Sequence, residues 1–169
     1  MTKQLRALTG KVVLITALFS LLTACGFHLR GVQEVSADKQ QVTLITSNAN
    51  QQLLRSLRQN MKFNGIRETA DAKYQIQILN HRYKRRAATI SSSSDVDEYE
   101  ISVEVKMLIA DREGRPLSDD IRIQRERIYT YDKNAAAASS EQEELLRNEL
   151  YNAVAQTVLR RYLANNKAQ

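Results

Sequence analysis

The chain has 169 residues, with 25 Lys and Arg against 19 Asp and Glu and a single cysteine. Three of the cations, Lys3, Arg6 and Lys11, lie in the first 24 residues, which leaves 22 cations against 19 acids in the rest. Such a near balance argues against a general nucleic-acid binder. A lone cysteine cannot close an internal disulfide, so the fold must be held together by packing.

The first 24 residues have the pattern of a secretory signal. Positive residues precede an apolar run at 12–22, which is too short to remain as a membrane-spanning helix. The next four residues, Leu22-Thr23-Ala24-Cys25, resemble the lipobox of bacterial lipoproteins. The small residues fit a narrow peptidase cleft, and the thiol accepts a diacylglyceryl group. We therefore predict cleavage after Ala24 and acylation of Cys25.

Lipid attachment at Cys25 also predicts where the chain resides. Two or more acyl chains hold a protein durably on a membrane, whereas a single chain does so only marginally. Residue 26 is Gly rather than Asp, and Asp at this place resembles an inner-membrane retention signal. The expected location is the outer membrane, facing the periplasm. Residues 25–169 are then the mature part, long enough for one domain.

The first half of the mature part predicts one strand and one helix. Residues 42–46 are short, β-branched and apolar, which is typical of a buried strand. Residues 47–50 offer N-caps for a helix that ends at Asn64 and Gly65. The apolar side chains of this helix recur at helical spacing: Leu53, Leu54, Leu57 and Met61.

The second half predicts three strands and a long helix. Apolar and polar residues alternate at 74–78, at 101–105 and from 121 raggedly toward 131, which favours an antiparallel meander. An extension of the first of these strands to Ile90 is left open. The final helix is expected to begin at Ser140, with a capping box at 140–143. Its apolar stripe contains Leu146, Leu150, Val154 and Val158.

The order β-α-β-β-β-α predicts an α+β fold. Two amphipathic helices and a sheet with one apolar face bury each other most simply as a two-layer sandwich. We expect two helices on a four-stranded mixed or antiparallel sheet.

The sequence gives little support to an enzyme. His28 and His81 lie in different segments without metal-ligand spacing, and neither a glycine-rich phosphate loop nor a nucleophile elbow is present. We expect a binding or assembly protein without a cofactor or a metal.

The densest positive charge is Lys84-Arg85-Arg86. Consecutive residues of a strand point to opposite faces, so all three share a surface only if the strand twists or bulges. These cations could pair with anionic phosphates of a lipid headgroup. They could equally guard a sheet edge against pairing with another chain.

The residues Cys25-Gly26-Phe27-His28-Leu29-Arg30-Gly31 resemble the N-terminus of the LptE family of lipopolysaccharide-assembly lipoproteins. Residues 53–65, Glu98-Tyr99 and residues 141–151 are also similar to that family. The resemblance implies a two-layer fold, a position as a plug in the lumen of an LptD-type outer-membrane β-barrel, and binding of lipopolysaccharide. It implies no nucleic-acid partner.

The chain departs from that family at two places. Basic residues associated there with lipopolysaccharide binding, near the middle hairpin and before the last helix, are replaced here by residues 91–94 and 135–140, which are serines and alanines. Either the phosphate contacts have moved to nearby cations or binding is weaker. The candidate cations are Arg82, Lys84, Arg85, Arg86 and Lys133.

A stand-alone carrier of lipid or another apolar ligand is the alternative. A large dry cavity between the sheet and the helices would favour the carrier, and a filled core with a polar exterior would favour the plug.

Overall fold

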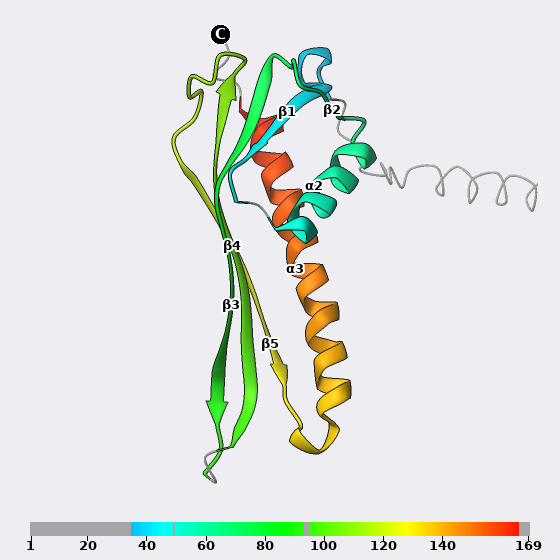
Figure 1. The fold of residues 1–169 in the computed structure, drawn as a ribbon, viewed down its shortest axis with the longest axis vertical. Helices are drawn as coiled ribbons and strands as arrows, with labels where there is room; N and C mark the ends of the chain where they lie inside the picture. Colours follow the sequence, from blue (N-terminus) through cyan, green and yellow to red (C-terminus); the bar gives the residue numbers. More distant parts are fainter. Residues whose placement is uncertain (1–34, 49, 93–94, 166–169) are drawn as a thin grey trace, which may run out of the picture. The chain divides into compact units, whose positions relative to one another are not determined.

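The computed structural model describes residues 35–48, 50–92 and 95–165 (Figure 1). The predicted signal at 1–24 and the predicted acylation site at Cys25 lie outside these ranges. The elements in chain order are the 3₁₀ helix η1 (Ala37–Lys39), β1 (Gln41–Thr46), α2 (Gln51–Phe63), β2 (Arg67–Glu68), β3 (Tyr74–Ile90), β4 (Val96–Asp111), β5 (Ile121–Thr130), the 3₁₀ helix η2 (Lys133–Ala135) and α3 (Ala136–Ala164).

The strands form one sheet in the order β2-β1-β3-β4-β5. β1 is parallel to β2 and β3, and the pairs β3–β4 and β4–β5 are antiparallel. The predicted α+β class and element order are confirmed, with five strands rather than four. The fifth strand, β2, follows Gly65, whose φ of 69° reverses the chain after α2 and lets Arg67 pair with Gln41.

The sheet changes composition along its length. β1 pairs with β3 only over residues 75–78 of β3, and β5 pairs with β4 only over residues 98–107 of β4. Beyond the end of β1, therefore, the described part of the sheet is a three-stranded ribbon. It consists of β3 after the pairing with β1 ends at Ile78, together with the parts of β4 and β5 that pair with it, and we call it the distal ribbon. α3 runs beside it (Figure 1).

A bulge in β3 marks the junction. The pairing with β4 shifts between Ile78 and Asn80, while β4 continues without interruption there. An extra residue in one strand reverses the alternation of its side chains. Before the bulge Ile76 and Ile78 are buried under the helices, and after it the odd-numbered residues His81 and Tyr83 face α3.

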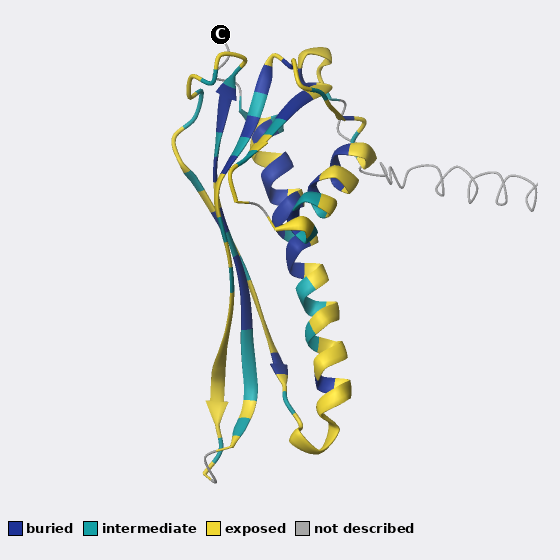
Figure 2. Cartoon of the chain, in the orientation of Figure 1, coloured by how far each residue is buried: buried dark blue, intermediate teal, exposed yellow. Residues whose placement is uncertain are grey.

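The apolar core lies between the sheet and the two helices. α2 is capped by the Asn50 side chain, which accepts a hydrogen bond from the amide of Gln52. It buries Leu53, Leu57 and Met61 as predicted. Figure 2 shows burial concentrated where both helices cover the sheet and sparse along the lower turns of α3.

α3 buries one stripe over its second half, with Leu150, Tyr151, Val154, Ala155, Val158, Leu159 and Tyr162 all at 2% exposure or less. Its last carbonyls are capped by a buried lysine: Lys39 Nζ donates to the carbonyl oxygens of Leu163 at 2.7 Å and Asn165 at 2.8 Å. A cation is favoured at this end of a helix. Among the described helices, none is long and apolar enough to cross a membrane.

Candidate functional site

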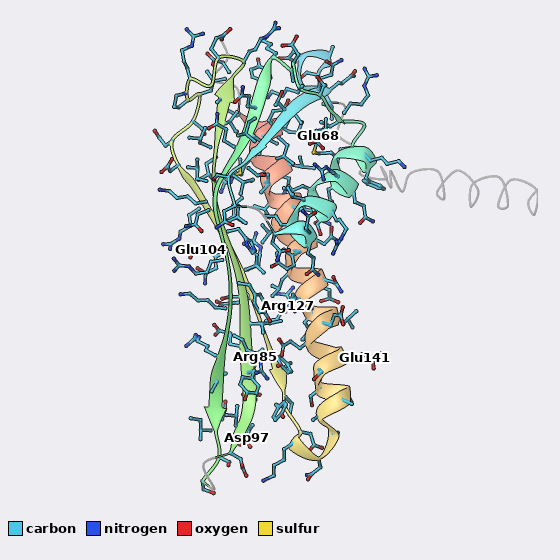
Figure 3. The ribbon with its side chains drawn as sticks, viewed as in Figure 1. Glu68, Arg85, Asp97, Glu104, Arg127 and Glu141 are labelled. Atoms are coloured by element: carbon cyan, nitrogen blue, oxygen red, sulfur yellow. The ribbon has the colours of Figure 1, made fainter. Side chains whose placement is uncertain are left out.

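The structure divides the predicted basic cluster between two faces of the distal ribbon. Arg85 points toward α3, where its Nε lies 2.9 Å from the Glu143 carboxylate. Its neighbours Lys84 and Arg86 therefore point to the opposite side. Figure 3 shows Arg85 on the side of the ribbon that faces α3 and Glu104 on the other side. We call the side away from α3 the outer face.

The outer face carries charges of both signs in cross-strand rows. Arg86 makes two hydrogen bonds to Glu100, at 2.8 and 2.7 Å, and Arg122 lies 2.9 Å from Glu104. Arg82 and Lys84, both exposed, form no ion pair within 4.0 Å with a carboxylate of the described residues. These two cations are consequently the members of the predicted set that remain available to an external anion.

The positive charges of this face affect the pKa of Glu104. A hydrogen bond from Arg122, opposed by desolvation and reinforced by the charges of Arg122, Arg82 and Lys84, lowers the pKa of its carboxyl group. The glutamate therefore stays ionised, and it neutralises one of the three cations around it.

On the inner side, Arg85 belongs to a network with Glu143 and two tyrosines. Arg85 Nε donates to the Tyr129 hydroxyl at 3.1 Å, and the hydroxyl groups of Tyr83 (2.9 Å) and Tyr129 both donate to the Glu143 carboxylate. The Arg85 guanidinium also lies 3.5 Å from the centre of the Tyr99 ring, a cation–π contact. We call Tyr83, Arg85, Tyr129 and Glu143 the tyrosine–glutamate network. Arg85 is committed to holding the ribbon against α3.

Lys133 lies at the end of the ribbon, in η2. Its Nζ is 2.7 Å from the Asp95 carboxylate, next to the turn between β3 and β4. Lys84 is seven residues before Ser91, which corresponds to roughly 20 Å of extended strand. The structure thus does not gather Lys133 and Lys84 into one cluster.

Two residues of the outer face were missed by the sequence analysis. Arg122 and Lys106 stand opposite each other on β5 and β4, and Lys106 pairs with Asp120 at 2.6 Å. The alternation of Ile121 and Ile123 with Arg122 carries the signal for the first of them, because it assigns the arginine to the polar side. Within the described ranges, no three His, Cys, Asp or Glu side chains are grouped so that they could hold a metal ion.

The surface hollows bear on the carrier alternative. One groove of about 450 Å³ lies between α2 and α3 and is lined mainly by polar residues, among them Gln52, Gln59, Asn148 and Asn152. A second lies along α3 around Leu145. Both are open at the surface, whereas the space between sheet and helices is filled by the apolar cluster.

The filled core and the charge-mixed ribbon are consistent with the binding or assembly protein that the sequence predicts. Residues 35–162 match the model of the LptE family, described as lipopolysaccharide-assembly. The chain belongs to this family, which is not an enzyme family, in agreement with the sequence analysis.

Relatives in sequence agree with this membership, and solved structures share the fold. The chain is 27% identical to the LPS-assembly lipoprotein LptE of Pectobacterium atrosepticum, over 95% of the chain and 85% of the relative. It is 26% identical to LptE of Yersinia pestis, over 98% and 78%. Its fold is similar to lipoprotein B of Nitrosomonas europaea (TM-score 0.70, 22% identity, 85% and 94% covered). The rare lipoprotein B of Shewanella oneidensis is a further match (0.61, 22%, 72% and 92%).

Proposed function

We propose that this chain is an outer-membrane lipoprotein that plugs and supports an LptD-type β-barrel and binds lipopolysaccharide on its way to the cell surface. Residues 1–24 are then a cleaved signal, and residues 25–169 are the mature protein tethered by acyl chains on Cys25. Family membership supports the role in lipopolysaccharide assembly, and the relatives in Pectobacterium and Yersinia are named as lipoproteins of that process.

The main observation in support of the plug role is the mixture of charges on the outer face of the distal ribbon. The lumen of a membrane β-barrel is polar, so a plug needs a polar, charge-mixed surface rather than an apolar one. Arg86–Glu100 and Arg122–Glu104 supply paired charges on such a surface. Pairs of this kind meet a polar wall without leaving a large net charge facing it.

Arg82 and Lys84 are the proposed contacts for lipopolysaccharide. Phosphate groups are bound well by guanidinium and ammonium donors. These two side chains are exposed and have no carboxylate within ion-pair distance in the described part of the chain. Arg85, Arg86 and Lys133 are already paired with Glu143, Glu100 and Asp95 and contribute less.

The partner is tested by isolating the full chain from outer membranes in mild detergent and identifying by mass what comes with it. A large β-barrel protein at one-to-one stoichiometry is expected. Recovery of the lipoprotein with lipid but without a barrel would favour the carrier instead. The mass of the purified N-terminus checks acylation. As a second check, Cys25→Ala should remove the lipid and release the protein from the membrane.

The lipid contacts are tested by replacing Arg82 and Lys84 with Ser and measuring lipopolysaccharide binding. The double variant should bind more weakly at low salt, and its difference from the parent should shrink as salt screens the charges. Lys62 and Arg67, two exposed cations on α2 and β2, give a control with the same loss of charge. Equal weakening by both double variants would reduce the effect to net charge and refute the assignment.

A further inference from the structure

Two arginines from different elements converge on one buried hydroxyl group on the helix-facing side of β5. The Oγ1 atom of Thr157, in α3, lies 3.2 Å from Arg125 Nη2 of β5 and 2.9 Å from Arg160 Nη2 of α3. The two Nη2 atoms are therefore no more than about 6 Å apart. Thr157 is buried at 9% exposure and is fixed by its own hydrogen bond to the carbonyl oxygen of Ala153 at 2.9 Å.

Neither guanidinium has a carboxylate partner in the part of the chain that the structure describes. Within the described residues, Arg125 and Arg160 form no ion pair within 4.0 Å. The arginines that do form such pairs here are Arg58, Arg85, Arg86, Arg112, Arg115 and Arg122. Two positive charges at this separation repel each other, and a neutral hydroxyl oxygen compensates only part of that repulsion.

The remaining donors suit an oxyanion. Thr157 Oγ1 accepts from both arginines and donates to Ala153, so its hydrogen-bonding capacity is used. Arg125 Nη1 donates a hydrogen bond to the carbonyl oxygen of Gln124. Each guanidinium carries five N–H donors, so several on both make no hydrogen bond to a described residue. Arg160 is exposed and Arg125 is half-buried, which leaves the site accessible from solvent.

We propose that Arg125, Thr157 and Arg160 form a binding site for a phosphate group. A carboxylate is planar and is matched by one guanidinium fork, whereas a tetrahedral phosphate presents oxygens to two forks that approach from different elements. The site does not depend on the proposed function, because it faces α3, whereas the proposed lipopolysaccharide contacts Arg82 and Lys84 lie on the outer face. The phosphate can come from free phosphate or from a lipid headgroup.

Thermal unfolding of the full chain in mild detergent tests the repulsion. In dilute chloride buffer Arg160→Gln should raise the Tm by about 2 °C, because it removes one of two like charges. Exchanging chloride for phosphate at equal ionic strength should raise the Tm of the parent by more than that of the variant, which keeps only the general stabilising effect of phosphate. Arg55→Gln, an exposed arginine of α2, is the control: it keeps the site, so phosphate should raise its Tm as much as that of the parent. If the Tm of the parent were the same in chloride and in phosphate, the proposal would be overturned.

Arginine Nε–Hε resonances of the unmodified sequence provide a second measurement, independent of whether variants fold. Titration with inorganic phosphate should shift the Arg125 and Arg160 signals to saturation and leave Arg55 unmoved, and Thr157→Val should weaken the binding severalfold. A matching shift with lipopolysaccharide, absent after its enzymatic dephosphorylation, assigns the phosphate to the lipid. Shifts with inorganic phosphate alone assign it to the free anion. Uniform shifts over all arginines, or stronger binding of a carboxylate-rich peptide than of phosphate, would contradict the site.

Discussion

The two halves of α3 are held against the sheet by different forces. From Leu150 to Tyr162 the helix buries an apolar stripe, whereas between residues 136 and 147 Ser139 is the one described residue that is buried. In that first half the tyrosine–glutamate network makes the contact, together with the partly buried Leu146 of the predicted stripe. Apolar burial is tolerant of direction, but hydrogen bonds require defined partners. The same helix therefore combines a stable base with an extension whose position depends on a few polar groups.

The largest effect is expected in the apolar half. Leu150→Ala removes a side chain with 0% exposure and should lower the free energy of unfolding by about 2–5 kcal/mol. Leu145→Ala, five residues earlier on the same helix, has an exposed side chain at 60% and should cost less than about 0.5 kcal/mol. Urea unfolding measures both. Equal costs would mean that the two halves do not differ as described.

The network half should respond to loss of a single hydroxyl. Tyr129→Phe removes the donor to Glu143 and the acceptor for Arg85 while keeping the buried ring, and should cost about 1 kcal/mol. The effect should also be local. Hydrogen exchange should accelerate for the amides of residues 140–147 and stay unchanged for residues 154–162. Acceleration over the whole helix would show that the halves unfold together.

The sequence predicted the apolar half of this comparison well. Leu53, Leu57, Leu150 and Val154 repeat at helical spacing, and the structure buries them. Periodicity reports burial directly because water exclusion acts on each apolar side chain independently of its partner. The cap at Asn50 and the turn at Gly65 were predicted for similar local reasons.

The polar half was beyond such local rules. Ser140 was expected to begin the last helix, but α3 begins at Ala136, because the alanine run has the highest helix propensity and extends the helix by a turn. The Ser139 hydroxyl instead bonds to the backbone of Asp132. Because of the bulge after Ile78, Arg85 rather than Lys84 faces α3. No residue type in β3 predicts a bulge at this position.

Acid should weaken the network before it weakens the apolar half. Burial alone would raise the pKa of Glu143, but hydrogen bonds from Tyr129 and Tyr83 and the positive charges of Arg85 and Arg147 outweigh it and lower the pKa below its usual 4.5. A carboxyl with a lowered pKa in the folded state stabilises the protein fully above pH 4.5. That stabilisation is lost as pH falls through the folded-state pKa.

This contribution is measured as the pH dependence of unfolding. Between pH 6 and pH 3 the parent should lose more stability than Glu143→Gln, whose side chain does not titrate. Glu141→Gln, an exposed neighbour on α3, is the control and should follow the parent. Parallel curves for the parent and Glu143→Gln would show that the network does not depend on the carboxylate charge.

The smallest expected effect comes from the junction between the halves. His81 Nε2 lies 3.0 Å from the Tyr151 hydroxyl, the two rings are stacked at 5.5 Å, and burial lowers the pKa of the imidazole below 6.5. The folded state therefore favours the neutral ring, so stability is complete above pH 6.5 and declines as pH falls through the lowered pKa. His81→Gln should flatten the stability curve as pH falls below 6.5, while leaving the decline below pH 4.5 that belongs to Glu143. Because the loss due to His81 begins near pH 6.5 and the loss due to Glu143 only near pH 4.5, the pair of variants divides the pH response between the junction and the network. A His81→Gln curve parallel to that of the parent above pH 5 would mean that protonation of the ring is tolerated, and would place the weak point of α3 entirely at the network.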